Sequence, residues 1–136
     1  MPNGTGTVRV PSPMPVDLPP PTPPDATGRK RVYVNPPVIH IGIGDERLKN
    51  VRFTNHTGDT VRIWLLEAAS LFVPPAKDNE GKEYKDFYTP FVVKAGGTLD
   101  VDLKPNLGYG DYPYHVFCDA IGHEADGNSP PYVSCP

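Results

Sequence analysis

The sequence has few of the segments that would place a chain in a membrane or direct it to export. No run approaches the roughly twenty consecutive apolar residues of a transmembrane helix, and the N-terminus lacks the apolar region of a secretory signal. We therefore expect no membrane span, and this chain shows no signal peptide. These absences leave the compartment open.

Basic clusters and catalytic motifs are also scarce. Thirteen Lys and Arg residues against sixteen Asp and Glu residues give a formal net charge of −3, and the one basic cluster is Arg29-Lys30-Arg31. Without a basic stripe to neutralise a row of phosphates, nucleic acid is not expected as a partner. The sequence contains no GxSxG, no HExxH and no phosphate-binding glycine loop followed by lysine, so we do not expect an enzyme.

Only two cysteines are present, Cys118 and Cys135, and they allow two interpretations that exclude each other. A Cys118–Cys135 disulfide would contribute about 3 kcal/mol through loop closure and would imply a periplasmic or secreted protein. Alternatively, Cys118 is a metal ligand and Cys135 is unpaired. The disulfide is favoured because its partner is present, whereas the methionines that could complete a soft metal site are only Met1 and Met14.

Proline is the abundant residue, with 19 of the 136 positions, and nine of the prolines fall within residues 1–30. Such a segment favours extended polyproline II or coil over helix or sheet. We therefore expect residues 1–30 to form a flexible arm that docks on a protein partner or on another copy of the chain, because a pre-extended backbone loses little entropy on binding.

After residue 31 the pattern changes to short segments that alternate apolar and polar residues, which is typical of half-buried strands. Two pairs of these segments predict hairpins, one turning at Gly58-Asp59 and the other at Gly96-Gly97. Seven to eight strands with no convincing helix predict an all-β sandwich over residues 31–136. The segments are residues 32–34, 38–41, 50–55, 60–65, 91–93, 98–103, 112–117 and 132–135.

The strand at residues 50–55, the glycine turn at 95–97 and the Gly110-Asp111-Tyr112-Pro113-Tyr114 entry to the Cys118 strand resemble the cupredoxin family. The resemblance covers roughly residues 38–136 and implies a Greek-key sandwich. It also implies that Cys118 and His123 stand at copper-ligand positions. The family's other histidine position is apolar here, near Ile63 or Trp64, and no methionine lies among residues 125–128.

These observations predict a copper-free sandwich that acts as a binding or structural subunit. The alternatives are an electron-transfer protein whose atypical type 1 copper uses Cys118, His123 and either His56 or His40, and a secreted, disulfide-bonded binding module. The expected partner-binding residues are Val8, Val10, Leu18, Pro19, Pro20, Pro21, Pro23 and Pro24 in the arm, and Trp64, Tyr109 and Tyr112 on the sandwich.

Overall fold

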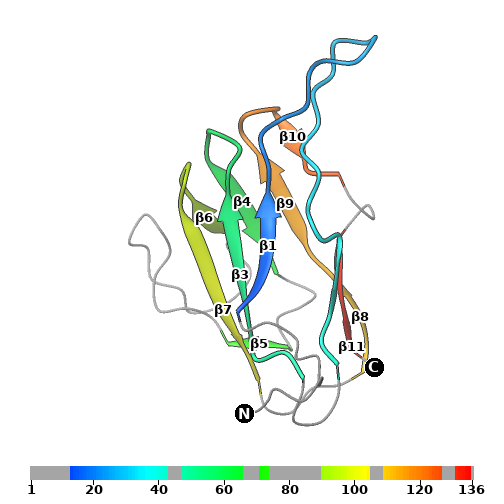
Figure 1. The fold of residues 1–136 in the computed structure, drawn as a ribbon, viewed down its shortest axis with the longest axis vertical. Helices are drawn as coiled ribbons and strands as arrows, with labels where there is room; N and C mark the ends of the chain where they lie inside the picture. Colours follow the sequence, from blue (N-terminus) through cyan, green and yellow to red (C-terminus); the bar gives the residue numbers. More distant parts are fainter. Residues whose placement is uncertain are drawn as a thin grey trace, which may run out of the picture.

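The computed structural model describes residues 13–42, 47–65, 71–73, 90–104, 109–126 and 131–135. These residues form strands and no helix, which confirms the predicted all-β class. Accordingly, none of them belongs to a helix long and apolar enough to cross a membrane. The strands are β1 (Met14–Leu18), β2 (Val38–His40), β3 (Asn50–Asn55), β4 (Val61–Trp64), β5 (Phe72–Val73), β6 (Phe91–Val93), β7 (Thr98–Leu103), β8 (Gly110–Pro113), β9 (His115–Cys118), β10 (His123–Glu124) and β11 (Tyr132–Cys135), shown in Figure 1.

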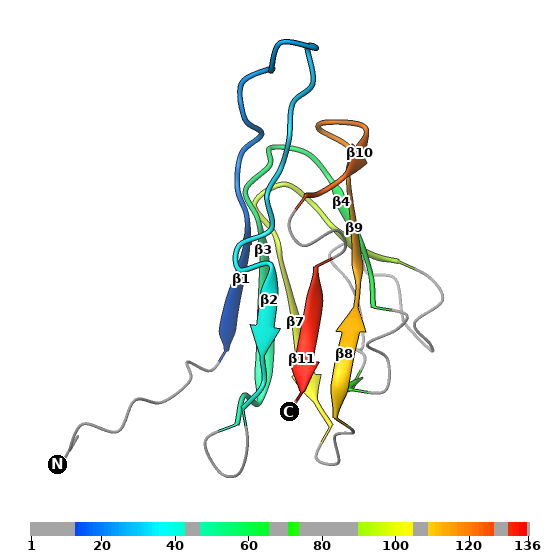
Figure 2. The same ribbon diagram turned by 90° about the vertical axis from the view of Figure 1, so that its right-hand side faces the viewer.

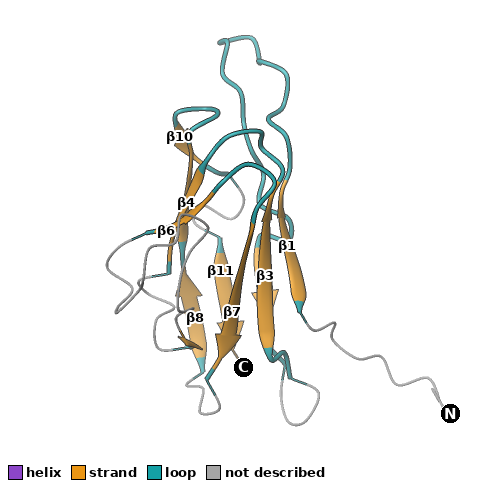
Figure 3. Ribbon diagram, turned by 90° about the vertical axis from the view of Figure 1, so that its left-hand side faces the viewer, coloured by secondary structure: helices purple, strands orange, loops and turns teal. Residues whose placement is uncertain are grey.

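The strands are arranged in two facing layers, as Figure 3 shows. One layer is a four-stranded sheet in the order β1-β3-β7-β5. The other layer contains a four-stranded sheet, β10-β9-β4-β6, and a three-stranded sheet, β2-β11-β8. Only Tyr114 separates β8 from β9, so the chain passes directly from one of these two sheets into the other. The predicted sandwich is therefore confirmed, with more and shorter strands than expected.

The core lies between the layers and is built from the inward residues of the alternating strands. On β3, for example, Val51 and Phe53 are fully buried while Arg52 between them is exposed, as the two-residue period of a strand requires. Tyr114 is fully buried at the junction of β8 and β9, and its ring meets that of Phe53 edge to face with centroids 5.6 Å apart. This contact joins the two layers at the centre of the molecule.

The boundary predicted between the arm and the sandwich is wrong, because part of the proposed arm belongs to the domain. Residues 14–18 form β1, which pairs in parallel with β3 from Met14↔Val51 to Leu18↔Asn55. Val16 and Leu18 are fully buried in the core. Proline at position 15 is compatible with this placement because β1 is an edge strand, which needs hydrogen bonds on one side only.

The two predicted hairpins are also corrected. β3 and β4 do not pair with each other, since β3 pairs with β7 in one layer and β4 pairs with β6 and β9 in the other. The turns at residues 56–60 and 94–97 therefore carry the chain across the sandwich from one layer to the opposite one. Alternation and a glycine turn predict a reversal of direction, but they do not distinguish a hairpin from such a crossing.

Asn55 holds the two crossing turns together. It is fully buried, and its side-chain amide donates to the carbonyls of Asp59, at 2.6 Å, and Val93, at 2.9 Å. Its side-chain oxygen accepts from the backbone and the hydroxyl of Thr57, and its backbone exchanges hydrogen bonds with Gly96 and Gly97. A single polar side chain thus connects β3 in one layer to β6 in the other.

The remaining segments follow the prediction closely. β2, β11 and the line formed by β8 and β9 lie where alternation placed strands. Residues 32–34 make only an isolated bridge, between Tyr33 and Asp126, and the short strands β5 and β10 were not predicted.

Candidate functional site

A long hairpin rises beyond the end of the sandwich and connects β1 to β2, as Figures 1 and 2 show. Its two legs are residues 19–24 and 29–35, and residues 23–30 are all exposed. The backbone N–H of Thr22 donates to the carbonyl of Arg31 at 2.8 Å, and the Thr22 hydroxyl accepts from the N–H of Arg31. The proline-rich segment is therefore one leg of a hydrogen-bonded hairpin.

Asp25 organises the tip of this hairpin. Its Oδ1 accepts hydrogen bonds from the N–H of Thr27, at 2.8 Å, and of Arg29, at 3.0 Å. The hydrogen bond from the Thr27 hydroxyl, followed by these backbone bonds, lowers the pKa of Asp25 below its ordinary value. Gly28 lies in the left-handed region with φ of 82°, which few other residues adopt without strain. The tip is thus a specific turn.

The base of the hairpin is anchored to both layers. Asp17 at the edge of β1 exchanges two backbone hydrogen bonds with Asn35, at 2.7 and 3.0 Å. On the other side, the backbone carbonyl of Asp126 accepts a hydrogen bond from the N–H of Val34, and the backbone N–H of Asp126 donates to the carbonyl of Val32. The return leg of the hairpin therefore links β1 in one layer to the segment that follows β10 in the other.

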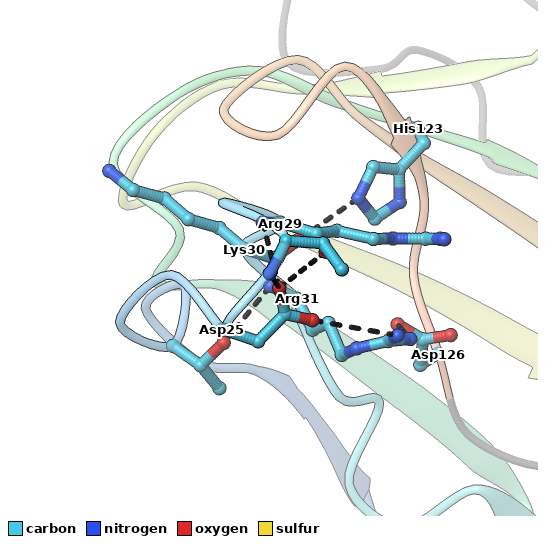
Figure 4. A network of polar contacts seen from close by, with 8 residues as sticks. Asp25, Arg29, Lys30, Arg31, His123 and Asp126 are labelled. Carbon is cyan, nitrogen blue, oxygen red and sulfur yellow. Dashed lines mark hydrogen bonds and ion pairs between the residues drawn. The ribbon is translucent and has the colours of Figure 1, made fainter.

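Side chains near β10 add a second anchor, shown in Figure 4. Arg31 pairs with Asp126 at 3.3 Å and lies 4.0 Å from Asp25. The His123 ring places Nε2 3.0 Å from the carbonyl oxygen of Lys30 and Nδ1 2.8 Å from that of Glu124. The ring donates to one carbonyl when it is neutral and to both when it is protonated. His123 thus ties β10 to the backbone of the hairpin.

Two cations of the tip remain available. Arg29 and Lys30 are exposed, and neither side chain has an ion-pair partner within the described ranges. Arg29 also bounds a cleft of about 400 Å³ between the hairpin and the sandwich, with His123, Glu124 and Asp126 on the opposite side. The hairpin therefore presents positive charge both at its tip and above a cleft.

The predicted disulfide is not formed, since Cys118 and Cys135 are both free and buried. Cys135 pairs with Gly110 at the start of β8, whereas Cys118 ends β9. Eight residues of extended chain span about 25 Å, far beyond the roughly 7 Å limit between bridged Cα atoms. The sheet register therefore keeps the two thiols at opposite ends of the sandwich.

Cys118 ends β9 directly opposite His123 on β10, and it has the surroundings of a core thiol. It is fully buried among core residues, and burial, with smaller contributions from Asp119 and Asp126, raises its pKa to about 12. In the absence of a metal ion the thiol is therefore protonated, and copper would have to displace this proton in order to bind. Coordination through either His123 nitrogen would require breaking one of its contacts with a carbonyl oxygen.

The alternative histidines are not brought to Cys118. His40 pairs with Ser134, which is opposite Asp111, so it lies at the far end of the sandwich. His56 is exposed beside Asp17, with 3.8 Å between Nε2 and Oδ1. In the part of the chain that the structure describes, no three His, Cys, Asp or Glu side chains are grouped to hold a metal ion. The residues present therefore do not fit a type 1 copper site.

The predicted partner-binding residues differ in how far they are exposed. Leu18 is buried and is removed from the set, while Pro20, Pro23 and Pro24 are exposed on the hairpin, where Pro19 and Pro21 are half-buried. Tyr109 is 84% exposed, and Trp64 and Tyr112 are half-buried. Val8 and Val10 lie outside the described residues.

Sequence reasoning missed the two contacts that shape this region. The ion pair of Arg31 with Asp126 joins residues far apart in the chain, and no local pattern announces it. The second contact joins His115 Nδ1 to Oε1 of Glu124 at 2.7 Å. The direction of His115, away from its neighbours, was predicted, but its partner was not. The alternation of β9 supplied the direction of His115, whereas its partner depends on the turn into β10.

No protein-family model matches the sequence, and no curated protein matches it. A search of solved structures finds similarity to a purple cupredoxin from Nitrosopumilus maritimus, at 17% sequence identity and a TM-score of 0.43. The similar region covers 90% of this chain and 98% of that chain.

Proposed function

We propose that this chain is a non-catalytic binding subunit that docks on a protein partner through the hairpin of residues 19–35 and works without copper. The observation that supports the docking role is the construction of the hairpin. Its base is held by Asp17 and Asp126, and His123 holds the return leg at the carbonyl of Lys30, whereas residues 23–30 are exposed. A preformed projection loses less conformational entropy on binding than a flexible tail.

The charge of the tip favours a partner with an acidic surface. Arg29 and Lys30 extend from the end of the hairpin, while Arg31 is compensated by Asp25 and Asp126. Complementary charge accelerates association and selects among partners more than it increases affinity. The docking surface in this proposal is therefore the tip with its two uncompensated cations, and the exposed prolines give the tip a stiff leg.

A charge-reversal variant tests the docking role. We expect R29E/K30E to lose partner proteins that the wild-type chain retains from the native extract, with the loss quantified by mass spectrometry. The control is K49E/K94E, which makes the same change of net charge at two exposed positions outside the hairpin and should retain the same proteins as wild type. Equal retention by the hairpin variant and the wild type would contradict the proposal.

The proposal that the chain works without copper is tested separately. A type 1 site absorbs intensely in the visible range because charge transfers from the thiolate to copper. Because no three His, Cys, Asp or Glu side chains are grouped to hold a metal ion among the described residues, we expect no such band when Cu(II) is added to the folded protein at pH 7. A strong visible band that disappears in Cys118→Ala would instead support electron transfer.

A further inference from the structure

The outer face of the sheet β10-β9-β4-β6 carries a second feature, on the side away from the core. Alternation turns Ile63, Val116 and Cys118 inward, so the residues between them point outward. Trp64 lies opposite His115 across β4 and β9, and Glu124 on β10 lies opposite Phe117 on β9. Two aromatic side chains, an imidazole and a carboxylate thus gather on neighbouring strands.

These four residues line a groove of about 330 Å³. The volume is within the range of sites that hold small molecules. Trp64 and Phe117 provide an apolar surface, and Glu124 is the one charged residue that lines the groove among those described. When His115 is neutral, this mainly apolar groove carries one negative charge and favours a cation over an anion.

The carboxylate of Glu124 is held at the wall of the groove by its neighbour. His115 Nδ1 lies 2.7 Å from Oε1 of Glu124, while Oε2 makes no hydrogen bond or ion pair with the described residues. Arg62, the closest cation along β4, is engaged in an ion pair with Asp119. Its positive charge is therefore compensated outside the groove.

We propose that this groove binds a small organic cation of the methylated ammonium class. The faces of Trp and Phe rings attract cations through the ring quadrupole, and Trp is the strongest of the aromatic side chains in this respect. Methyl groups on the cation match the apolar walls, while Glu124 supplies the opposite charge. His115 and Glu124 also line the cleft bounded by Arg29, but all four residues of the groove belong to strands of the sandwich, so the proposal does not depend on the docking role.

The experiment uses Trp64 itself as the reporter, since it is the only tryptophan of the chain. Choline is titrated into the full-length protein at constant ionic strength while tryptophan fluorescence is recorded. The neutral isostere 3,3-dimethyl-1-butanol is titrated in parallel, because it has the same shape without the charge. We expect a saturable change with choline and binding at least about fivefold weaker for the neutral alcohol.

Two variants complete the test. Glu124→Gln keeps the shape of the side chain and removes its charge, and we expect it to weaken choline binding by about fivefold or more. Asp102→Asn removes a charge from an exposed position of β7 in the other layer and should bind choline as wild type does. Circular dichroism confirms that each variant is folded, and Phe117→Leu, which retains an apolar side chain, provides an independent loss of affinity.

Three results would overturn the proposal. The first is the absence of a saturable change with choline up to high millimolar concentration. The second is equal affinity for choline and the neutral alcohol, which would make the groove merely apolar. The third is unchanged choline binding in folded Glu124→Gln. Choline binding that persists in R29E/K30E would separate this site from the docking proposal.

Discussion

Replacement of Asn55 by alanine is the sharpest test of how the two layers are joined. The variant removes four hydrogen bonds of a fully buried side chain, two donated to carbonyls and two accepted from Thr57. Each such bond contributes about 1 kcal/mol, and the partners left unpaired in the interior make the loss larger rather than smaller. We therefore expect the free energy of unfolding to fall by about 3 to 4 kcal/mol.

Urea unfolding followed by the fluorescence of Trp64 measures this change, with linear extrapolation to water. Asn55→Asp separates hydrogen bonding from packing, because aspartate has nearly the same size but cannot donate to Asp59 and Val93 in its ionised form. It should be at least as destabilising as alanine. Thr98→Ala, an exposed position at the same end of the sandwich, should change stability by less than about 0.5 kcal/mol. A stable Asn55→Asp variant would refute the role given to the amide.

Three further predictions concern other parts of the chain. Leu18→Ala should lower the free energy of unfolding by about 2 to 5 kcal/mol because Leu18 is fully buried. A chemical denaturation curve identical to that of the wild type would show that residues 14–18 are not part of the folded domain. Tyr114→Phe should leave stability equal or raise it by about 1 kcal/mol, because the Tyr114 hydroxyl is buried with no hydrogen-bond partner among the residues described. A decrease of more than about 1 kcal/mol in the free energy of unfolding, measured by calorimetry, would show that the hydroxyl has such a partner. Because hydrogen bonds lower the pKa of Asp25, the tip of the hairpin is stabilised above the ordinary aspartate value of 3.8 and loses this stabilisation as pH falls through the lowered pKa. Hydrogen exchange at the amides of Thr27 and Arg29, corrected for intrinsic rates, should accelerate over that range, and protection that is constant down to pH 2 would contradict it.

The class of fold was predictable because the period of two is visible in single strands. Val51 and Phe53 alternate with polar residues, and both are buried as the pattern requires. The same pattern does not specify which strand lies alongside, so both crossing turns were interpreted as hairpins. The signal that distinguishes them is Asn55, an amide at a position that alternation assigns to the core. A buried amide needs partners, and here they are Thr57 and Asp59 in the crossing turn and Val93 in the opposite layer.

The arm was misjudged because composition was averaged over thirty residues. Within them, Val16 and Leu18 alternate in the manner of a strand, between Pro15 and Pro19, which is the spacing expected for a short edge strand. The prolines that suggested disorder instead leave β1 as an edge and stiffen the leg that follows it. Residues 19–30 belong to the hairpin, whose return leg could not be foreseen without the Thr22 and Asp126 contacts.

The proposed loss of copper and the presence of the hairpin are connected through His123. The resemblance to the cupredoxins places an imidazole at this position as a metal ligand, which would need a free nitrogen lone pair directed at the thiolate side. Here both nitrogens face carbonyl oxygens, and one of those belongs to Lys30 of the hairpin. The ring cannot hold the hairpin backbone in this way and also bind a metal through the same nitrogen. Under the proposed function, the end of the sandwich that resembles a copper pole is used instead to fix a projecting binding element.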